Sequence, residues 1–191
     1  MASKLYDFFV AGYDVAKFGG TNFFHTSVVV CPSAAKLSRE KLQDSHNLHM
    51  LLERAGCEEM IFDRNETGIW FNQDRGRWSL EEDQTSMVHW RYAGQVRLLG
   101  ATALEASEKL KRWAATPAAG NFTAGTYHLV DHNCNSFTAA ILRKVGFDPQ
   151  KVLACGSSSC SARDSTSKVP CLAPENAAFS PTMHRRLLTF L

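Results

Sequence analysis

The sequence predicts an α/β fold (α+β in stricter usage), in which helices pack against a small, mostly antiparallel sheet. Three observations predict it: a strand-like stretch at 23–31, shorter strand-like stretches further along, and two amphipathic helices with polar residues at their N-termini. The chain has 191 residues, of which 45% are hydrophobic and 21% are charged. This composition is typical of a globular domain and excludes a wholly disordered chain, a collagen-like repeat and a coiled coil.

The first strand is predicted over 23–31 because aromatic and β-branched residues are dense there. A period of two places Phe24, Thr26, Val28 and Val30 on one face. The other face carries Phe23, His25, Ser27 and Val29. The glycine pair at 19–20 indicates a turn before this strand.

The polar segment 33–56 is predicted to contain a helix. Leu48, Leu51 and Leu52 fit one helical face, and Gly56 stands where a C-terminal cap is expected. Residues 59–62 and 68–71 then predict two short strands around a turn at 63–66. We expect a charged loop over 72–86, followed by two strand pieces within 88–99 that are broken near Ala93 and Gly94.

Two further helices have clear start signals. Thr102 with Glu105 forms a capping box. The stripe expected to be buried on this helix is Leu104, Ala106, Leu110, Trp113 and Ala114, and residues 116–120 end it. The second helix is expected to begin near 134–136, since Asn and Ser are strong N-cap residues. Its apolar residues are Phe137, Ala140, Ile141 and Val145, and Gly146 closes it.

The chain divides by composition into a domain over 1–154 and a tail over 155–191 that is rich in Ser, Pro and Cys. Within the tail, residues 184–191 are expected to form a short terminal helix. No internal repeat is visible.

The net charge and the length of the apolar runs limit the classes of partner that we expect for this protein. Lys and Arg total 21 and Asp and Glu total 19, a net charge of +2, which is too balanced to favour nucleic acid or an acidic membrane. No apolar run approaches the ~18 residues of a membrane span, and the N-terminus shows no secretory h-region. We therefore expect six mostly reduced cysteines and a cytoplasmic or nuclear protein.

Cys134 is the first candidate for chemistry. A thiol at a helix N-terminus is stabilised as a thiolate by the helix dipole, and the unpaired N–H groups there can bind an oxyanion. The alternative is that Cys134 is a small core hydrophobe. His25 is the candidate base because a strand fixes its imidazole, and the alternative is a structural, half-buried histidine. His128 is expected on a preceding strand with a structural role, and His132 need not face Cys134.

Other chemistries have weaker support. His46 and His49 could share a helix face, and Cys155, Cys160 and Cys171 are loosely spaced, but neither set has the pairing of a zinc site, so no metal is expected. No phosphate-binding glycine loop and no serine-hydrolase elbow is present.

Several motifs together resemble the PPPDE family, the permuted papain-fold peptidases that include desumoylating isopeptidases. Phe24-His25-Thr26-Ser27-Val28-Val29-Val30 resembles the family's histidine strand. Residues 127–137 (YHLVDHNCNSF) resemble its cysteine motif, Tyr-x-Leu-x-x-x-Asn-Cys-Asn-x-Phe. Residues 96–102 resemble its strand and Gly-small-Thr turn, and Tyr6-Asp7 its first strand. The resemblance covers about 5–31 and 87–148, more loosely 59–71, and the order of His before Cys is the permuted one.

The resemblance implies a permuted papain-like fold without a cofactor, with Cys134 as the nucleophile and His25 as the general base. Asn133 and Asn135 match the motif, and we expect them to cap the helix and support the loop and the oxyanion site. Asp63 or Asn65 could orient the imidazole. Residues 33–56 would be an insertion, because His25 and Cys134 stand further apart than in compact members.

The implied activity is that of a cysteine isopeptidase acting on proteins whose lysines carry a ubiquitin-like modifier, SUMO or ubiquitin. Two alternatives stay open: a thioesterase that removes S-acyl groups from protein cysteines, and a binding module that kept the fold without activity. Nothing in the sequence selects the modifier or the oligomeric state.

Overall fold

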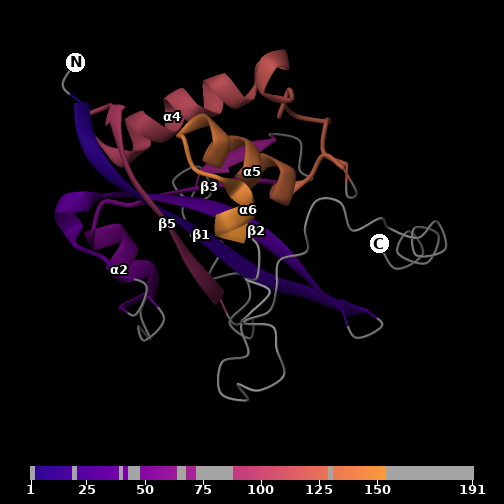
Figure 1. Cartoon of the computed structure of the whole chain (residues 1–191), viewed down its shortest axis with the longest axis horizontal. Coiled ribbons are helices and arrows are strands. Elements are labelled where there is room, and N and C mark those ends of the chain that lie inside the picture. Colours follow the sequence, from indigo (N-terminus) through magenta and orange to yellow (C-terminus); the bar gives the residue numbers. More distant parts are fainter. Residues whose placement is uncertain are drawn as a thin grey trace.

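The computed structural model describes residues 3–18, 21–38, 41–42, 48–63, 68–71, 88–128 and 131–153. The predicted loop at 72–86, the tail at 155–191 and its terminal helix lie outside these residues, as do His46, Asn65 and the three tail cysteines. Within them, five strands form one sheet, and helices lie against it (Figure 1). The predicted mixture of helices and a small sheet is confirmed.

The sheet has the order β4-β3-β2-β1-β5, and each neighbouring pair is antiparallel. Its strands are β1 (Ser3–Phe18), β2 (Thr21–Pro32), β3 (Glu58–Phe62), β4 (Ile69–Phe71) and β5 (Val88–Leu99). β2 pairs with β1 along its length but with β3 only over 28–30. The edge of β2 before Val28 therefore carries no partner from β3.

The stretch 88–99 is one strand rather than the two predicted pieces. Phe8 pairs with Gly94 and Phe9 with Tyr92, so Ala93 is an extra residue that forms a β-bulge. Gly94 has φ +140°, and a Cβ there would lie 2.6 Å from the ring of Phe147. The predicted break near Ala93 and Gly94 is therefore a β-bulge within one continuous strand.

One face of the sheet is covered by α4 (Ala103–Ala114) and α5 (Cys134–Lys144), which Figure 1 shows lying together; the short α6 (Pro149–Leu153) follows α5. Val28 and Val30 of β2 pack in this core, as the predicted alternation requires. The helices contribute Ala103, Ala106, Leu110, Ala114, Phe137, Ala140 and Ile141. On α4, Leu104 and Trp113 of the predicted stripe are only partly buried.

The caps of α4 and α5 agree with the sequence. The Thr102 hydroxyl accepts the Glu105 N–H at 3.2 Å. The Glu105 carboxylate reaches back to accept the Ala101 N–H at 2.7 Å, so the capping box closes one residue earlier than its usual form.

The other face is covered by α2 (Leu48–Arg54), within the segment interpreted as an insertion. Leu42 and Leu52 are buried against Phe9, Val29 and Trp90. The predicted cap is confirmed, because Gly56 has φ +67° and donates its N–H to the Glu53 carbonyl at 2.9 Å. The described part of this segment therefore forms a second core on the side of the sheet opposite α5.

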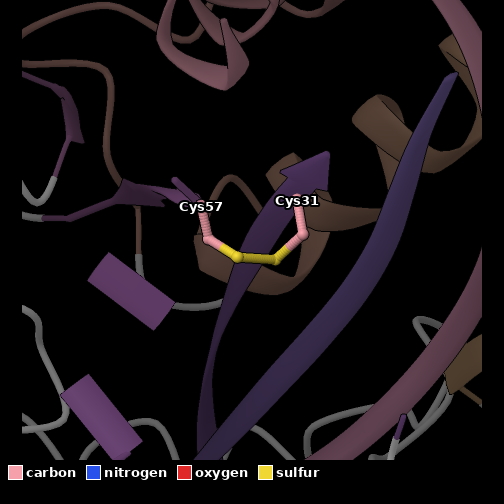
Figure 2. Close-up of a disulfide and its surroundings, with 2 residues drawn as sticks. All are labelled: Cys31 and Cys57. Carbon is pink, nitrogen blue, oxygen red and sulfur yellow. A yellow bond between two sulfur atoms is a disulfide. The ribbon is translucent and has the colours of Figure 1, made fainter. Parts of the chain in front are cut away.

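A disulfide joins Cys31 at the end of β2 to Cys57 just before β3 (Figure 2), with an S–S distance of 2.07 Å. The expectation of mostly reduced thiols is wrong for this pair. Disulfides persist mainly in oxidising compartments, so the pair removes one of the arguments for a cytoplasmic location. Cys134 is the free cysteine of the described residues. Among those residues, no helix combines the length and apolarity that a membrane crossing requires.

Phe137→Ala is expected to lower the free energy of unfolding by ~3–5 kcal/mol, because Phe137 is fully buried between α5 and the sheet and its loss leaves a cavity. Urea unfolding followed by circular dichroism measures this. Gln150→Ala, at an exposed position on α6, serves as the control and should change stability by less than ~0.5 kcal/mol. Equal effects of the two substitutions would contradict the packing described here.

Candidate active site

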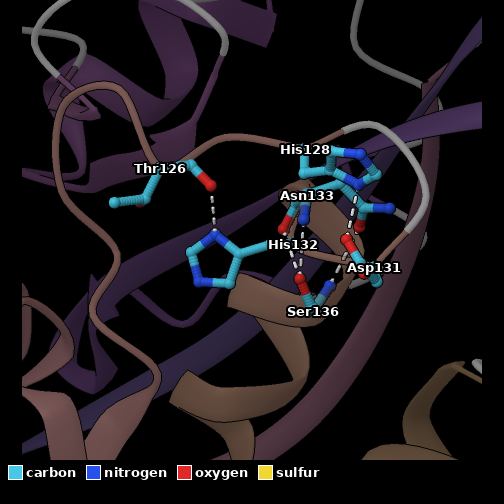
Figure 3. Close-up of polar contacts among 6 residues, drawn as sticks. All are labelled: Thr126, His128, Asp131, His132, Asn133 and Ser136. Carbon is cyan, nitrogen blue, oxygen red and sulfur yellow. Dashed lines mark hydrogen bonds and ion pairs between the residues drawn. The ribbon is translucent and has the colours of Figure 1, made fainter.

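The helix α5 begins at Cys134, as the sequence predicts. The Asn133 Oδ1 atom accepts the N–H groups of Asn135 at 2.9 Å and Ser136 at 3.2 Å, and the Ser136 hydroxyl accepts the Asn133 N–H at 2.7 Å (Figure 3). This reciprocal capping box fixes the first turn of α5. Asn133 therefore has the capping role expected of it.

The first turn of α5 is bonded directly to β2. The Thr26 hydroxyl donates to Asn135 Oδ1 at 2.8 Å and lies 3.1 Å from the hydroxyl of Thr138. Thr26 and Thr138 are fully buried. Asn135 thus holds the helix on the strand, a role that the sequence did not predict.

Cys134 and His25 meet at this junction. The thiol and the imidazole form a hydrogen bond, although their residue numbers differ by 109. The backbone N–H and the hydroxyl of Thr26 also contact the Cys134 sulfur. Because β3 pairs with β2 only from Val28 onward, the Thr26 N–H at the open edge is available to the sulfur. The structure therefore brings the predicted pair together.

The surroundings of Cys134 favour a thiolate. Burial raises the pKa of its thiol, but the charge and hydrogen bond of His25 and the hydrogen bonds with Thr26 lower it by more, so the pKa lies below its ordinary value. Cys134 is 4% exposed, and its sulfur contacts the His25 imidazole and both the backbone and the side chain of Thr26. These contacts favour the thiolate form of Cys134 over the thiol.

His25 is favoured in its protonated form. Burial lowers the pKa of its imidazole, but the Cys134 sulfur and then the Asp63 and Glu59 carboxylates raise it by more, so the pKa lies above its ordinary value. Asp63 was one of the two candidates from the sequence for orienting His25, and its charge does act there. A thiolate–imidazolium pair is the protonation state that both shifts favour.

Glu59 was not predicted as part of the site. It is fully buried on β3, and its carboxylate accepts the Ser27 hydroxyl at 2.6 Å on the same face of the sheet as His25. A glutamate inside a short apolar strand was the available signal, because buried carboxylates are rare without a partner.

Tyr127 is the second residue that sequence reasoning did not place in the site. Its phenol hydrogen-bonds with the Cys134 sulfur, and its oxygen accepts the Cys134 backbone N–H. Burial and then the charges of Cys134 and Asp63 raise the pKa of this phenol above its ordinary value. The sequence feature that could have identified Tyr127 was its place as the first residue of the cysteine motif.

The loop before α5 is held by His132, whose ring turns toward the Thr126 carbonyl in Figure 3. Its Nδ1 atom lies 2.7 Å from that oxygen, its Nε2 atom 2.7 Å from the Gly120 carbonyl, and its ring stacks on Phe122 with centroids 4.4 Å apart. His132 thus anchors the loop through both ring nitrogens and its stacking on Phe122.

His128 does not lie on a regular strand as predicted. It forms an isolated bridge with His132, and its imidazole is exposed and paired with the Asp131 carboxylate at 2.5 Å. Because the His128 ring is exposed to solvent, the prediction that it has a structural packing role is wrong.

No group of three or more His, Cys, Asp or Glu suited to a metal ion occurs in the described part of the chain. No protein-family model matches the chain, and no curated protein or solved structure matches it.

Iodoacetamide is expected to alkylate Cys134 with a pH midpoint below the ~8.5 of an ordinary thiol, because His25 and Thr26 stabilise the thiolate. His25→Gln should move the midpoint upward, since the largest stabilising partner is lost. Alkylation rates from pH 5 to 10, followed by peptide mass spectrometry without reductant, measure this and keep the Cys31–Cys57 disulfide intact.

His128→Gln is the matched control for this substitution, since its ring is exposed and bonded to Asp131. The control should leave the midpoint unchanged. A wild-type midpoint near that of free cysteine would contradict the electrostatics of the pair.

Proposed function

We propose that the protein is a cysteine isopeptidase with a permuted papain-like fold, which hydrolyses the bond between a ubiquitin-like modifier and a substrate lysine. The observation that carries the proposal is the hydrogen bond between the Cys134 thiol at the start of α5 and the His25 imidazole on β2. The strand that carries His25 precedes the helix that carries Cys134, and the sheet is antiparallel. Both features agree with the resemblance to the PPPDE family.

Cys134 is the nucleophile and His25 the general base and acid. The thiol proton passes to His25, and the sulfur adds to the carbonyl carbon as the carbonyl electron pair moves to oxygen. When that pair returns, the carbon–nitrogen bond breaks, and His25 gives its proton to the departing lysine amine. Water then attacks the thioester, loses a proton to His25 and releases the modifier's carboxyl end together with the free thiol.

The surroundings of the pair support this chemistry. The capping box of Asn133 and the bonds from Thr26 to α5 fix the sulfur before substrate binds, and pre-organisation of this kind lowers the barrier to attack. The Asp63 and Glu59 charges stabilise the imidazolium. The described residues thus supply a nucleophile, a base and groups that stabilise the charged pair.

SUMO or ubiquitin carrying a C-terminal electrophile is expected to form a covalent adduct with the wild-type protein and with Cys155→Ala, and none with Cys134→Ala. Gel shift and mass spectrometry detect the adduct, and a matched lysine isopeptide conjugate then tests turnover. The Cys155→Ala variant shows whether removing a cysteine other than Cys134 affects formation of the adduct. Hydrolysis of an S-acyl peptide without action on conjugates would identify a thioesterase. Absence of both capture and turnover would favour a binding module.

The rate of hydrolysis is expected to be bell-shaped in pH, since the thiolate–imidazolium pair forms above the lowered pKa of Cys134 and is lost above the raised pKa of His25. Asp63→Asn removes a charge that raises the pKa of His25, so the basic limb should move to lower pH. Steady-state rates across pH measure it. Asp131→Asn, at an exposed carboxylate bonded to His128, should leave both limbs in place. A basic limb unmoved by Asp63→Asn would rule out this role.

A further inference from the structure

Tyr127 contacts two atoms of Cys134 with one hydroxyl group. That hydroxyl hydrogen-bonds with the sulfur, and its oxygen accepts the Cys134 backbone N–H. The phenol thus lies between the atom expected to attack a carbonyl and the N–H expected to receive the resulting charge.

The ring of Tyr127 is held in place by aromatic packing. It lies 5.3 Å, between centroids, from the ring of Phe62, which is fully buried. Phe62 also contacts Phe137 of α5 at 5.9 Å and His132 at 5.4 Å, so one aromatic cluster supports both the phenol and the loop behind it. The hydroxyl therefore projects from a fixed ring.

The phenol remains a donor at neutral pH. Burial, followed by the charges of Cys134 and Asp63, raises its pKa above the ordinary value, so Tyr127 keeps its proton beside the thiolate. A neutral O–H next to a developing negative charge can stabilise that charge without giving up its proton.

The two neighbouring asparagines hold the first turn of α5 through their Oδ1 atoms. The Asn133 Oδ1 atom accepts two N–H groups of α5, and the Asn135 Oδ1 atom accepts the Thr26 hydroxyl. The Thr26 hydroxyl also lies against Thr138. Tyr127, by contrast, contacts both the Cys134 sulfur and its N–H.

When the sulfur bonds to a carbonyl carbon, the new oxyanion must lie beside that sulfur, within reach of the N–H of the same residue. In the free protein the Tyr127 oxygen holds this N–H. We propose that an incoming carbonyl oxygen displaces the phenol from the Cys134 N–H, and that the Tyr127 O–H then donates to the oxyanion. Tyr127 is thus the second donor of the oxyanion site, and this inference rests on the proposed function.

The step balances without a further reactant. The sulfur–carbon bond forms, and the carbonyl π electrons move to oxygen, which accepts hydrogen bonds from the Cys134 N–H and the Tyr127 O–H. No proton leaves the phenol. When the tetrahedral adduct collapses, the leaving group departs and the phenol returns to the Cys134 N–H.

The test uses acetylation of Cys134 by p-nitrophenyl acetate in the full chain, which needs no modifier and is followed by release of nitrophenolate. Tyr127→Phe keeps the ring and removes the hydroxyl. The acetylation rate should fall on the order of 10²-fold, the usual effect of losing one oxyanion donor. Alkylation by iodoacetamide, a displacement at a saturated carbon without an oxyanion, should stay within about threefold at a pH above both thiol midpoints. The matched control, Tyr92→Phe, removes a hydroxyl that donates to Asp7 at 3.0 Å, and should leave both rates unchanged.

The outcomes separate the two proposals. Acetylation unchanged in Tyr127→Phe overturns the oxyanion role, and so does a parallel fall in acetylation and alkylation, which would show that the phenol only positions the sulfur. A wild-type protein that is acetylated at Cys134 but neither captures nor hydrolyses modifier conjugates overturns the isopeptidase proposal alone. A wild-type protein that the ester does not acetylate overturns both.

Discussion

The contact between the first turn of α5 and the open edge of β2 is the constraint on which the site depends. Thr26 bonds to α5 through its hydroxyl and to the Cys134 sulfur through its hydroxyl and its N–H. The neighbouring residue on the strand, His25, completes the environment of the sulfur. Because β3 does not pair with β2 before Val28, the Thr26 N–H on that edge of β2 contacts the sulfur instead of a strand partner.

The two layers of helices make that contact rigid. The α5 side of the sheet buries Phe137 and Ile141 against Val28 and Val30, while α2 covers the opposite side with Leu52. A strand clamped on both faces cannot shift its side chains without opening a core. The strand that carries His25 is therefore held by packing on both faces, and Cys134 stands on a capped helix whose Phe137 and Ile141 are fully buried.

Much of this architecture could be predicted because local signals agree with the fold. The β2 strand, its alternating faces, the caps at Thr102, Asn133 and Gly56, and the start of α5 follow from residue type and period. Two residues that act on the Cys134–His25 pair were not predicted. Glu59 and Tyr127 act on it through tertiary contacts that leave no periodic trace, and the bulge at Ala93 reads as a break because glycine indicates a turn and a bulge equally well.

The Cys31–Cys57 disulfide lies directly beyond the short stretch over which β2 and β3 pair. β2 and β3 pair over only three positions, ending with Val30 opposite Glu58, and the two cysteines are the next opposing residues along the same register. A slip of one residue between strands turns every side chain to the opposite face, so in β3 it would carry the Glu59 carboxylate away from the histidine. The disulfide fixes the register of β2 and β3, so this slip cannot occur. The Glu59 carboxylate therefore stays where its charge acts on His25.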